Sequence, residues 1–154
     1  MATQDTRAEI ALRLERTIAA PPEKVFEAWT RPEVLSRWFA PSDEYNVVVT
    51  ELEARPGGRL RLEMRHRGGN VHIVSATFLE VKRPERLVFS WGWEGKPEEG
   101  ESQVTVAISS DGTRTQLVLL HEKLVSTASR DAHEHGWTGC LSRLPAAVET
   151  PASA

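Results

Sequence analysis

Two histidines are the side chains of this sequence whose type and position best suit chemistry. His121 follows Leu117 and Leu119 at alternating positions, so the three side chains would share one face of a strand. His133 begins an apolar stripe that recurs at helical spacing toward the C-terminus. If stripe and strand face each other, an imidazole there could orient a ligand hydroxyl or transfer a proton near neutral pH. We favour the simpler interpretation, in which both are structural histidines bonded to the backbone.

Metal binding and nucleophilic catalysis find little support. His133 and His135 stand two residues apart, hence on different faces of a helix, and His-Glu-x-x-His is absent. His66 and His72 flank a glycine-rich turn, yet two ligands alone rarely make a metal site. Cys140 is the only cysteine, and its expected state is a small buried thiol. Phosphate loops, dinucleotide fingerprints and Gly-x-Ser-x-Gly elbows are missing. We therefore expect no metal, no cofactor and no catalytic residue.

Apolar and aromatic side chains make the larger candidate set. They alternate along predicted strands or recur along the last helix, so they would converge on a concave, mostly apolar space of the kind that ligands prefer. The predicted ligand-binding residues are Trp38, Leu62, Met64, Phe89, Trp91, Leu119, His121, His133, Trp137 and Leu141. Among the tryptophans, Trp38 and Trp93 are expected nearest the pocket mouth. The alternative is that the apolar members simply fill the core.

The elements that must position these residues are mainly strands. Residues 59–65 alternate leucine or methionine with charged residues, which is typical of a strand with one buried face. Gly68 and Gly69 then supply hairpin chemistry, because glycine accepts positive φ angles. Similar patterns occupy residues 10–14, 45–52, 71–81, 87–93, 104–108 and 115–121. About seven short strands joined mostly by hairpins predict an antiparallel sheet in an α+β fold.

Two short helices are predicted after the first strand. Pro21 and Pro22 can open the first helix, since proline fits the first helical turn. Thr30 and Glu33 have the spacing of a capping box for the second helix, which Pro41 ends.

A long helix is predicted from Ser126 or Thr127 to the C-terminal region. Gly136 and Gly139 lie inside it and weaken it, which suggests close approach by a backbone or a ligand. Pro145 predicts a kink or an early end of the helix, because proline lacks the backbone N–H and crowds the preceding turn.

Length and composition indicate one globular domain spanning residues 1–154, with a core from 10 to 148 and loose ends at 1–8 and 149–154. The net charge of −3 argues against a nucleic-acid partner. No secretion signal or membrane-length apolar run is present, so we expect a cytoplasmic protein. A basic ridge of Arg59, Arg61, Arg65 and Arg67 could meet an acidic partner, although a solvated face explains it more simply.

Five local motifs follow one another in a characteristic order. They are the opening-helix segment 20–29, Trp-Phe-x-Pro at 38–41, Pro-Gly-Gly at 56–58, Pro-x-x-Leu at 84–87 and Gly-Trp at 136–137. Together they resemble the START-like superfamily, also called SRPBCC or Bet v 1-like, in the branch named after the activator of the ninety-kilodalton heat-shock protein's ATPase (AHSA). The resemblance implies a helix-grip fold, in which a curved antiparallel sheet wraps a long C-terminal helix.

The resemblance leaves three functions open. The first is a non-enzymatic protein that binds an apolar or aromatic small molecule between sheet and helix. The second is a cyclase, dehydratase or hydrolase that uses the same cavity, with His121 or His133 as acid–base. The third is a chaperone co-factor of the activator type, which is less favoured because a separate N-terminal chaperone-binding domain has no room in 154 residues. A homodimer is compatible with each.

Overall fold

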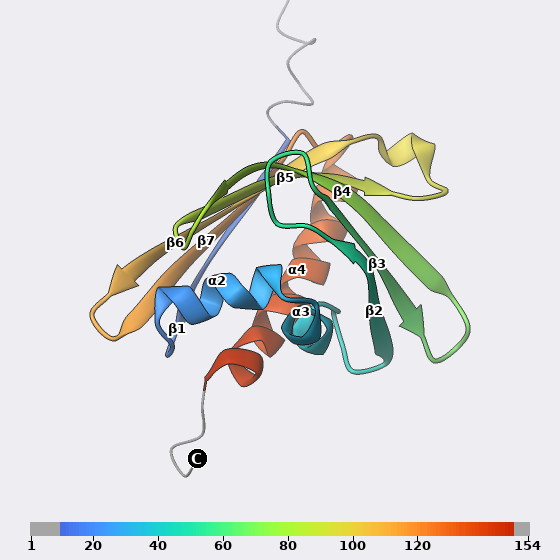
Figure 1. The fold of residues 1–154 in the computed structure, drawn as a ribbon. Helices are drawn as coiled ribbons and strands as arrows, with labels where there is room; N and C mark the ends of the chain where they lie inside the picture. Colours follow the sequence, from blue (N-terminus) through green and yellow to red (C-terminus); the bar gives the residue numbers. More distant parts are fainter. Residues whose placement is uncertain (1–9, 150–154) are drawn as a thin grey trace, which may run out of the picture.

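A single antiparallel sheet forms the frame of the protein. The computed structural model describes residues 10–149. Its strands are β1 (Leu12–Ile18), β2 (Tyr45–Leu52), β3 (Arg59–His66), β4 (Val71–Lys82), β5 (Arg86–Trp93), β6 (Ser102–Asp111) and β7 (Arg114–Glu122), in the spatial order β1-β7-β6-β5-β4-β3-β2. The sheet arches over helices α2 (Pro22–Thr30), α3 (Pro32–Trp38) and α4 (Thr127–Val148), which lie on its concave side (Figure 1). The α+β helix-grip architecture predicted from the sequence is confirmed.

Strand β3 shows how side-chain alternation builds the core. Leu60, Leu62 and Met64 are buried on the concave face, while Arg59 and Arg65 are exposed on the other side. Because successive side chains of a strand point to opposite faces, one strand supplies both the wall of the interior and a charged outer surface.

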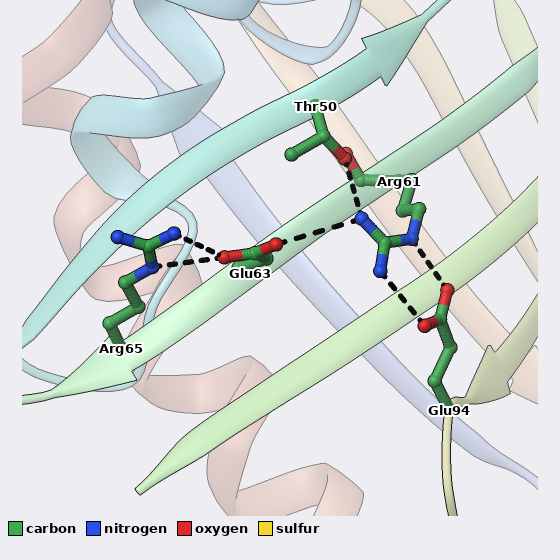
Figure 2. A network of polar contacts seen from close by, with 5 residues as sticks. All are labelled: Thr50, Arg61, Glu63, Arg65 and Glu94. Carbon is green, nitrogen blue, oxygen red and sulfur yellow. Dashed lines mark hydrogen bonds and ion pairs between the residues drawn. The ribbon is translucent and has the colours of Figure 1, made fainter. Parts of the chain in front are cut away.

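The outer face of β3 carries paired charges rather than a basic ridge. Arg61 donates twice to Glu94, at 2.6 and 3.0 Å, and also lies 3.6 Å from Glu63 (Figure 2). Arg65 donates to the other side of Glu63 at 2.7 Å. The hydrogen bonds from Arg61 lower the pKa of Glu94. Arg59 donates instead to the hydroxyls of Thr77 and Ser75. Because Arg61 and Arg65 each face a carboxylate, this surface offers less free positive charge to an acidic partner than the sequence indicated.

The junction of the two short helices differs from the predicted capping box. Thr30 is the last residue of α2, and its hydroxyl donates to the carbonyl of Phe26 inside that helix. The N-cap of α3 is Arg31, which makes no side-chain capping bond. Pro32 opens α3 in its place, because its fixed φ suits the first helical turn.

Helix α4 begins as predicted. The Ser126 side chain caps it by accepting a hydrogen bond from the backbone N–H of Ser129 at 3.0 Å. Of the two outcomes predicted at Pro145, a kink or an early end, the early end does not occur, since the helix continues to Val148. Val148 and Leu144 are buried against the remaining core, so tertiary packing offsets the hydrogen bond that proline cannot donate.

The residue that follows the helix, Glu149, is bonded to the rest of the fold. Glu149 was predicted to belong to a loose end, but its carboxylate accepts a hydrogen bond from the backbone N–H of Ala19 at 2.9 Å. The other predicted loose ends, 1–8 and 150–154, lie outside the described residues. Within residues 10–149, no helix is long and apolar enough to cross a membrane.

Candidate functional site

A cavity lies between the N-terminal half of α4 and one half of the sheet. Strands β3, β4 and β5 form one wall and α4 the other, while the segment from Phe39 to Tyr45 and the β5–β6 connection complete it. Its volume is about 650 Å³. That volume falls within the range of roughly 300 to 1,000 Å³ typical of sites for small organic molecules.

Aromatic rings dominate the apolar wall. Trp91 lies at the centre, with ring centroids 5.1 Å from Trp137, 5.5 Å from Trp93 and 6.0 Å from Phe39. The pair Trp91–Trp93 meets edge to face, as does the pair Phe39–Trp137 at 5.4 Å. Edge-to-face contacts of this kind are favourable, so they hold the rings of this wall in fixed orientations.

Four of the ten residues predicted for ligand binding line this cavity: Met64, Trp91, His133 and Trp137. Trp93, expected at the mouth, lines it too and is half-buried. Both the sheet and α4 therefore contribute some of the predicted residues to the cavity.

The other six are packed into the core: Trp38, Leu62, Phe89, Leu119, His121 and Leu141. Trp38 in particular is not at a pocket mouth. Its indole N–H donates to the carbonyl of Ala28 at 3.0 Å, and its ring lies 4.7 Å from that of Trp29. The physical reason is that α2 and α3 cover part of the concave face and fill the space that these side chains would otherwise border (Figure 1).

Sequence reasoning missed much of the polar rim. Ser42, Glu44, Lys96, Glu99 and His135 line the cavity from two connections and from α4. The first four lie in connections, which lack the hydrophobic periodicity that marks buried faces, so no pattern could have selected them. His135 lies in α4, two residues from His133 and therefore off the apolar stripe that was used for the prediction. The close approach expected at the glycines of α4 occurs at Gly139, where an added Cβ would lie 2.4 Å from the carbonyl oxygen of Pro41. It does not occur at Gly136, which lines the cavity with no atom within 4 Å of the position its Cβ would take.

His121 is held as a neutral imidazole in the core. The indole N–H of Trp137 donates to Nδ1 of His121 at 3.0 Å. Nδ1 must then be the acceptor, so Nε2 carries the proton and donates to Ser102 Oγ at 2.7 Å. Burial, together with the nearby His133, lowers the pKa of His121 well below its usual value.

His133, at the cavity wall, has the two ring nitrogens in exchanged roles. The indole N–H of Trp93 donates to its Nε2 at 2.9 Å, so the proton sits on Nδ1 and is donated to the backbone carbonyl of Ser129 at 2.7 Å. The two imidazole rings lie 4.8 Å apart, so the predicted meeting of the histidines is confirmed. However, both nitrogens of each ring already have partners inside the protein.

Charged groups gather at the rim of the cavity. Glu99 accepts a hydrogen bond from the hydroxyl of Ser129 at 2.8 Å, and Glu44 faces His66 at 3.3 Å. Burial, followed by the charge of Lys96, lowers the pKa of His72. With carboxylates and an ammonium both present, the rim favours neither a strongly anionic nor a strongly cationic ligand.

Cys140 also lines the cavity but is buried, and burial raises its pKa to about 12. A neutral thiol is a poor nucleophile. Within residues 10–149, no group of three or more His, Cys, Asp or Glu side chains is placed to hold a metal ion.

An arched sheet that grips a C-terminal helix, with an aromatic cavity between them, defines a helix-grip protein. The chain belongs to the family described as activator of Hsp90 ATPase homolog 1-like protein, whose sequence pattern it matches over residues 19–149. None of the curated proteins searched matches this sequence.

Solved structures show the same relationship. A crystal structure of a Chromobacterium violaceum protein is similar with a TM-score of 0.84 at 26% identity, covering 92% of this chain and 98% of that one. A family protein from Silicibacter pomeroyi is 30% identical with a TM-score of 0.78, covering 88% of this chain and 95% of that one. A solution structure from Arthrobacter aurescens also has a TM-score of 0.84, at 19% identity over 95% of this chain and 90% of that one, which shows the fold alone.

Proposed function

We propose that this protein binds an apolar, aromatic small molecule in the cavity between β3–β5 and α4. The observation that carries the proposal is a cavity of about 650 Å³ whose apolar wall is built from Trp91, Trp93, Trp137 and Phe39. Aromatic rings provide large contact areas at fixed orientation, which favours planar ligands over flexible chains.

The histidine geometry favours binding over catalysis. An acid–base group must have a nitrogen free to meet the substrate. Tryptophan N–H groups occupy the unprotonated nitrogens of His121 and His133, and the protonated nitrogens donate to Ser102 and to the Ser129 backbone. Either histidine would have to break an internal hydrogen bond before it could transfer a proton.

Thermal scanning with two- and three-ring aromatic compounds such as fluorene tests the proposal. A ligand of the native state stabilises it by RT ln(1 + [L]/Kd), about 2.7 kcal/mol at a hundredfold excess over Kd. We expect an increase of several degrees in Tm for a chain of this size, accompanied by a change in tryptophan emission.

A cavity-filling variant makes the test specific. Gly136→Leu places a side chain in the cavity, where a Cβ meets nothing within 4 Å, and should abolish the thermal shift. Thr138→Leu introduces the same side chain at an exposed position of the same helix and should keep the thermal shift. Equal shifts in both variants would place the ligand elsewhere, and no shift for any compound with the wild type would refute apolar binding.

The family description supports one further candidate, a chaperone co-factor. Its test is direct binding of the purified chain to the ninety-kilodalton heat-shock protein and stimulation of that protein's ATPase. Binding unaffected by Gly136→Leu would separate a surface interaction with the chaperone from uptake of a small molecule.

A further inference from the structure

We infer that the cavity selects aromatic ligands carrying a hydrogen-bond acceptor, such as a ring ketone, which the indole N–H of Trp91 recognises. The inference rests on the proposed function and adds a ligand class and a specificity-determining residue to it.

The hydrogen bonds of the five tryptophans point to Trp91. The indole N–H groups of Trp38, Trp93 and Trp137 donate to Ala28 O, His133 Nε2 and His121 Nδ1. Those of Trp29 and Trp91 are buried and have no acceptor among the described residues. Only Trp91 of these two lines the cavity, and the whole residue is 3% exposed.

The neighbouring acceptors cannot serve Trp91. Its ring lies 5.5 Å from that of His121 and 6.3 Å from that of His133, centroid to centroid. However, the single unprotonated nitrogen of each imidazole already accepts from another tryptophan, Trp137 or Trp93. Both imidazole acceptors of this wall are therefore occupied by the indoles of Trp93 and Trp137, and the indole N–H of Trp91 is left without an acceptor within residues 10–149.

A buried donor discriminates between ligands that differ in one atom. A hydrocarbon covers the Trp91 N–H without pairing it, whereas a ketone of the same shape supplies the missing acceptor. Burying a donor without a partner is costly, so sites of this kind reject the analogue that lacks the polar group. The mixed charges of Lys96 and Glu99 at the rim fit a neutral acceptor better than a carboxylate.

Fluorene and fluorenone provide the matched probes, because they share three fused rings and differ only in a CH₂ or a carbonyl group. Their dissociation constants are measured by titration calorimetry for the wild type and for Trp91→Phe, which keeps an aromatic ring but removes the donor. We expect the preference for fluorenone over fluorene to fall about tenfold in Trp91→Phe. Taking the ratio of the two preferences cancels the intrinsic difference between the compounds.

Trp29→Phe is the matched control. It removes the second unpaired indole N–H, which does not line the cavity, and should keep the wild-type preference. An unchanged ratio in Trp91→Phe, with both probes still bound, overturns the inference and leaves the proposed function standing. If neither probe binds the wild type, the proposed function fails and the inference with it.

Indole N–H resonances of the ¹⁵N-labelled wild type give a second readout, needed if Trp91→Phe does not fold. Fluorenone should move one indole proton downfield, as expected on forming a hydrogen bond, and fluorene should not. If the two probes produce the same shifts, the inference is overturned.

Discussion

At the scale of single residues, the interior is organised by two tryptophan–histidine pairs. Trp137 donates to His121 and Trp93 donates to His133, so each indole fixes the tautomer of its partner. Because an indole N–H can only donate, a second proton on either accepting nitrogen would set two donors against each other. The pairs thereby hold four rings of the cavity region in place, provided that both imidazoles stay neutral.

This arrangement predicts that the protein loses stability in mild acid. Burial lowers the pKa of folded His121 well below 6.5, whereas in the unfolded chain it titrates near its ordinary value. As the pH falls below about 6.5, the unfolded state binds more protons than the folded state, so the free energy of unfolding falls. For one proton, the free energy of unfolding can fall by at most about 1.4 kcal/mol per pH unit.

Urea unfolding of the wild type and of His121→Gln, at about pH 7.5 and about pH 5.5, tests this prediction above the pKa range of most carboxylates. The variant should be less stable at the higher pH, and the gap should narrow at the lower pH. His72→Gln is the control. Burial lowers the pKa of His72 as it does that of His121, but by less. If the free energy of unfolding depended on pH equally in the wild type and in His121→Gln, the assignment of His121 as a neutral buried imidazole would be contradicted.

A second residue-scale prediction concerns Cys140. Its thiol is buried and has a pKa of about 12, so almost no thiolate exists at neutral pH. An aromatic disulfide reagent should therefore react with the native protein only as fast as the structure opens, and rapidly in urea. Fast stoichiometric labelling of the native protein would mean that the cavity admits the reagent to an activated thiol.

At the scale of elements, the two glycines of α4 lie in different surroundings and have different roles. Gly136 borders the cavity, where an added Cβ meets nothing within 4 Å. At Gly139 an added Cβ would lie 2.4 Å from the carbonyl oxygen of Pro41, so the missing side chain allows the chain after α3 to pass close to the helix. One glycine keeps space open and the other allows contact.

Opposite changes in stability should follow from replacing each glycine by alanine. Gly136→Ala should raise the free energy of unfolding by about 0.5 to 1 kcal/mol, because alanine favours the helix and nothing clashes. Gly139→Ala should lower it by about 1 to 3 kcal/mol, because the Pro41 backbone must move. Urea unfolding of both variants checks this, and changes of the same sign would contradict the close packing at Gly139.

The elements also show what the sequence could reveal. Strand alternation, as in Leu60, Leu62 and Met64, depends on local geometry and therefore predicted the sheet and its buried face well. The same pattern could not tell Trp91, which borders the cavity, from Phe89 two residues away, which packs in the core. That difference depends on where α2 and α3 lie under the sheet, and no periodicity within β5 contains it.

At the scale of the whole molecule, Arg143 ties together segments that are distant in the sequence. From α4 its guanidinium donates to the carbonyl of Ser42 at 2.8 Å and, more weakly, to those of Ala40 and Arg37 at 3.4 Å. These carbonyls lie at the end of α3 and in the segment that leads to β2. Phe39 and Ser42 of this segment line the cavity, so Arg143 and the contact at Gly139 together hold one wall against the helix.

Removing this tie should loosen that wall while leaving the sheet intact. Arg143→Met keeps the aliphatic part of the side chain but loses the hydrogen-bond donors. The free energy of unfolding should therefore fall by about 1 to 2 kcal/mol. This is near the lower end of the values for hydrogen bonds to charged groups, because the side chain is only partly buried. Amide hydrogen exchange should speed up in residues 39–44 more than in β5 or β6, since local opening follows the contacts that are lost. Arg143→Lys serves as the comparison: it retains the charge without the planar guanidinium and should recover only part of the protection.

If fluorene binds as proposed, it should also dissociate faster from Arg143→Met than from the wild type. Unchanged exchange in residues 39–44 would show that Gly139 and the aromatic contacts hold the wall without Arg143.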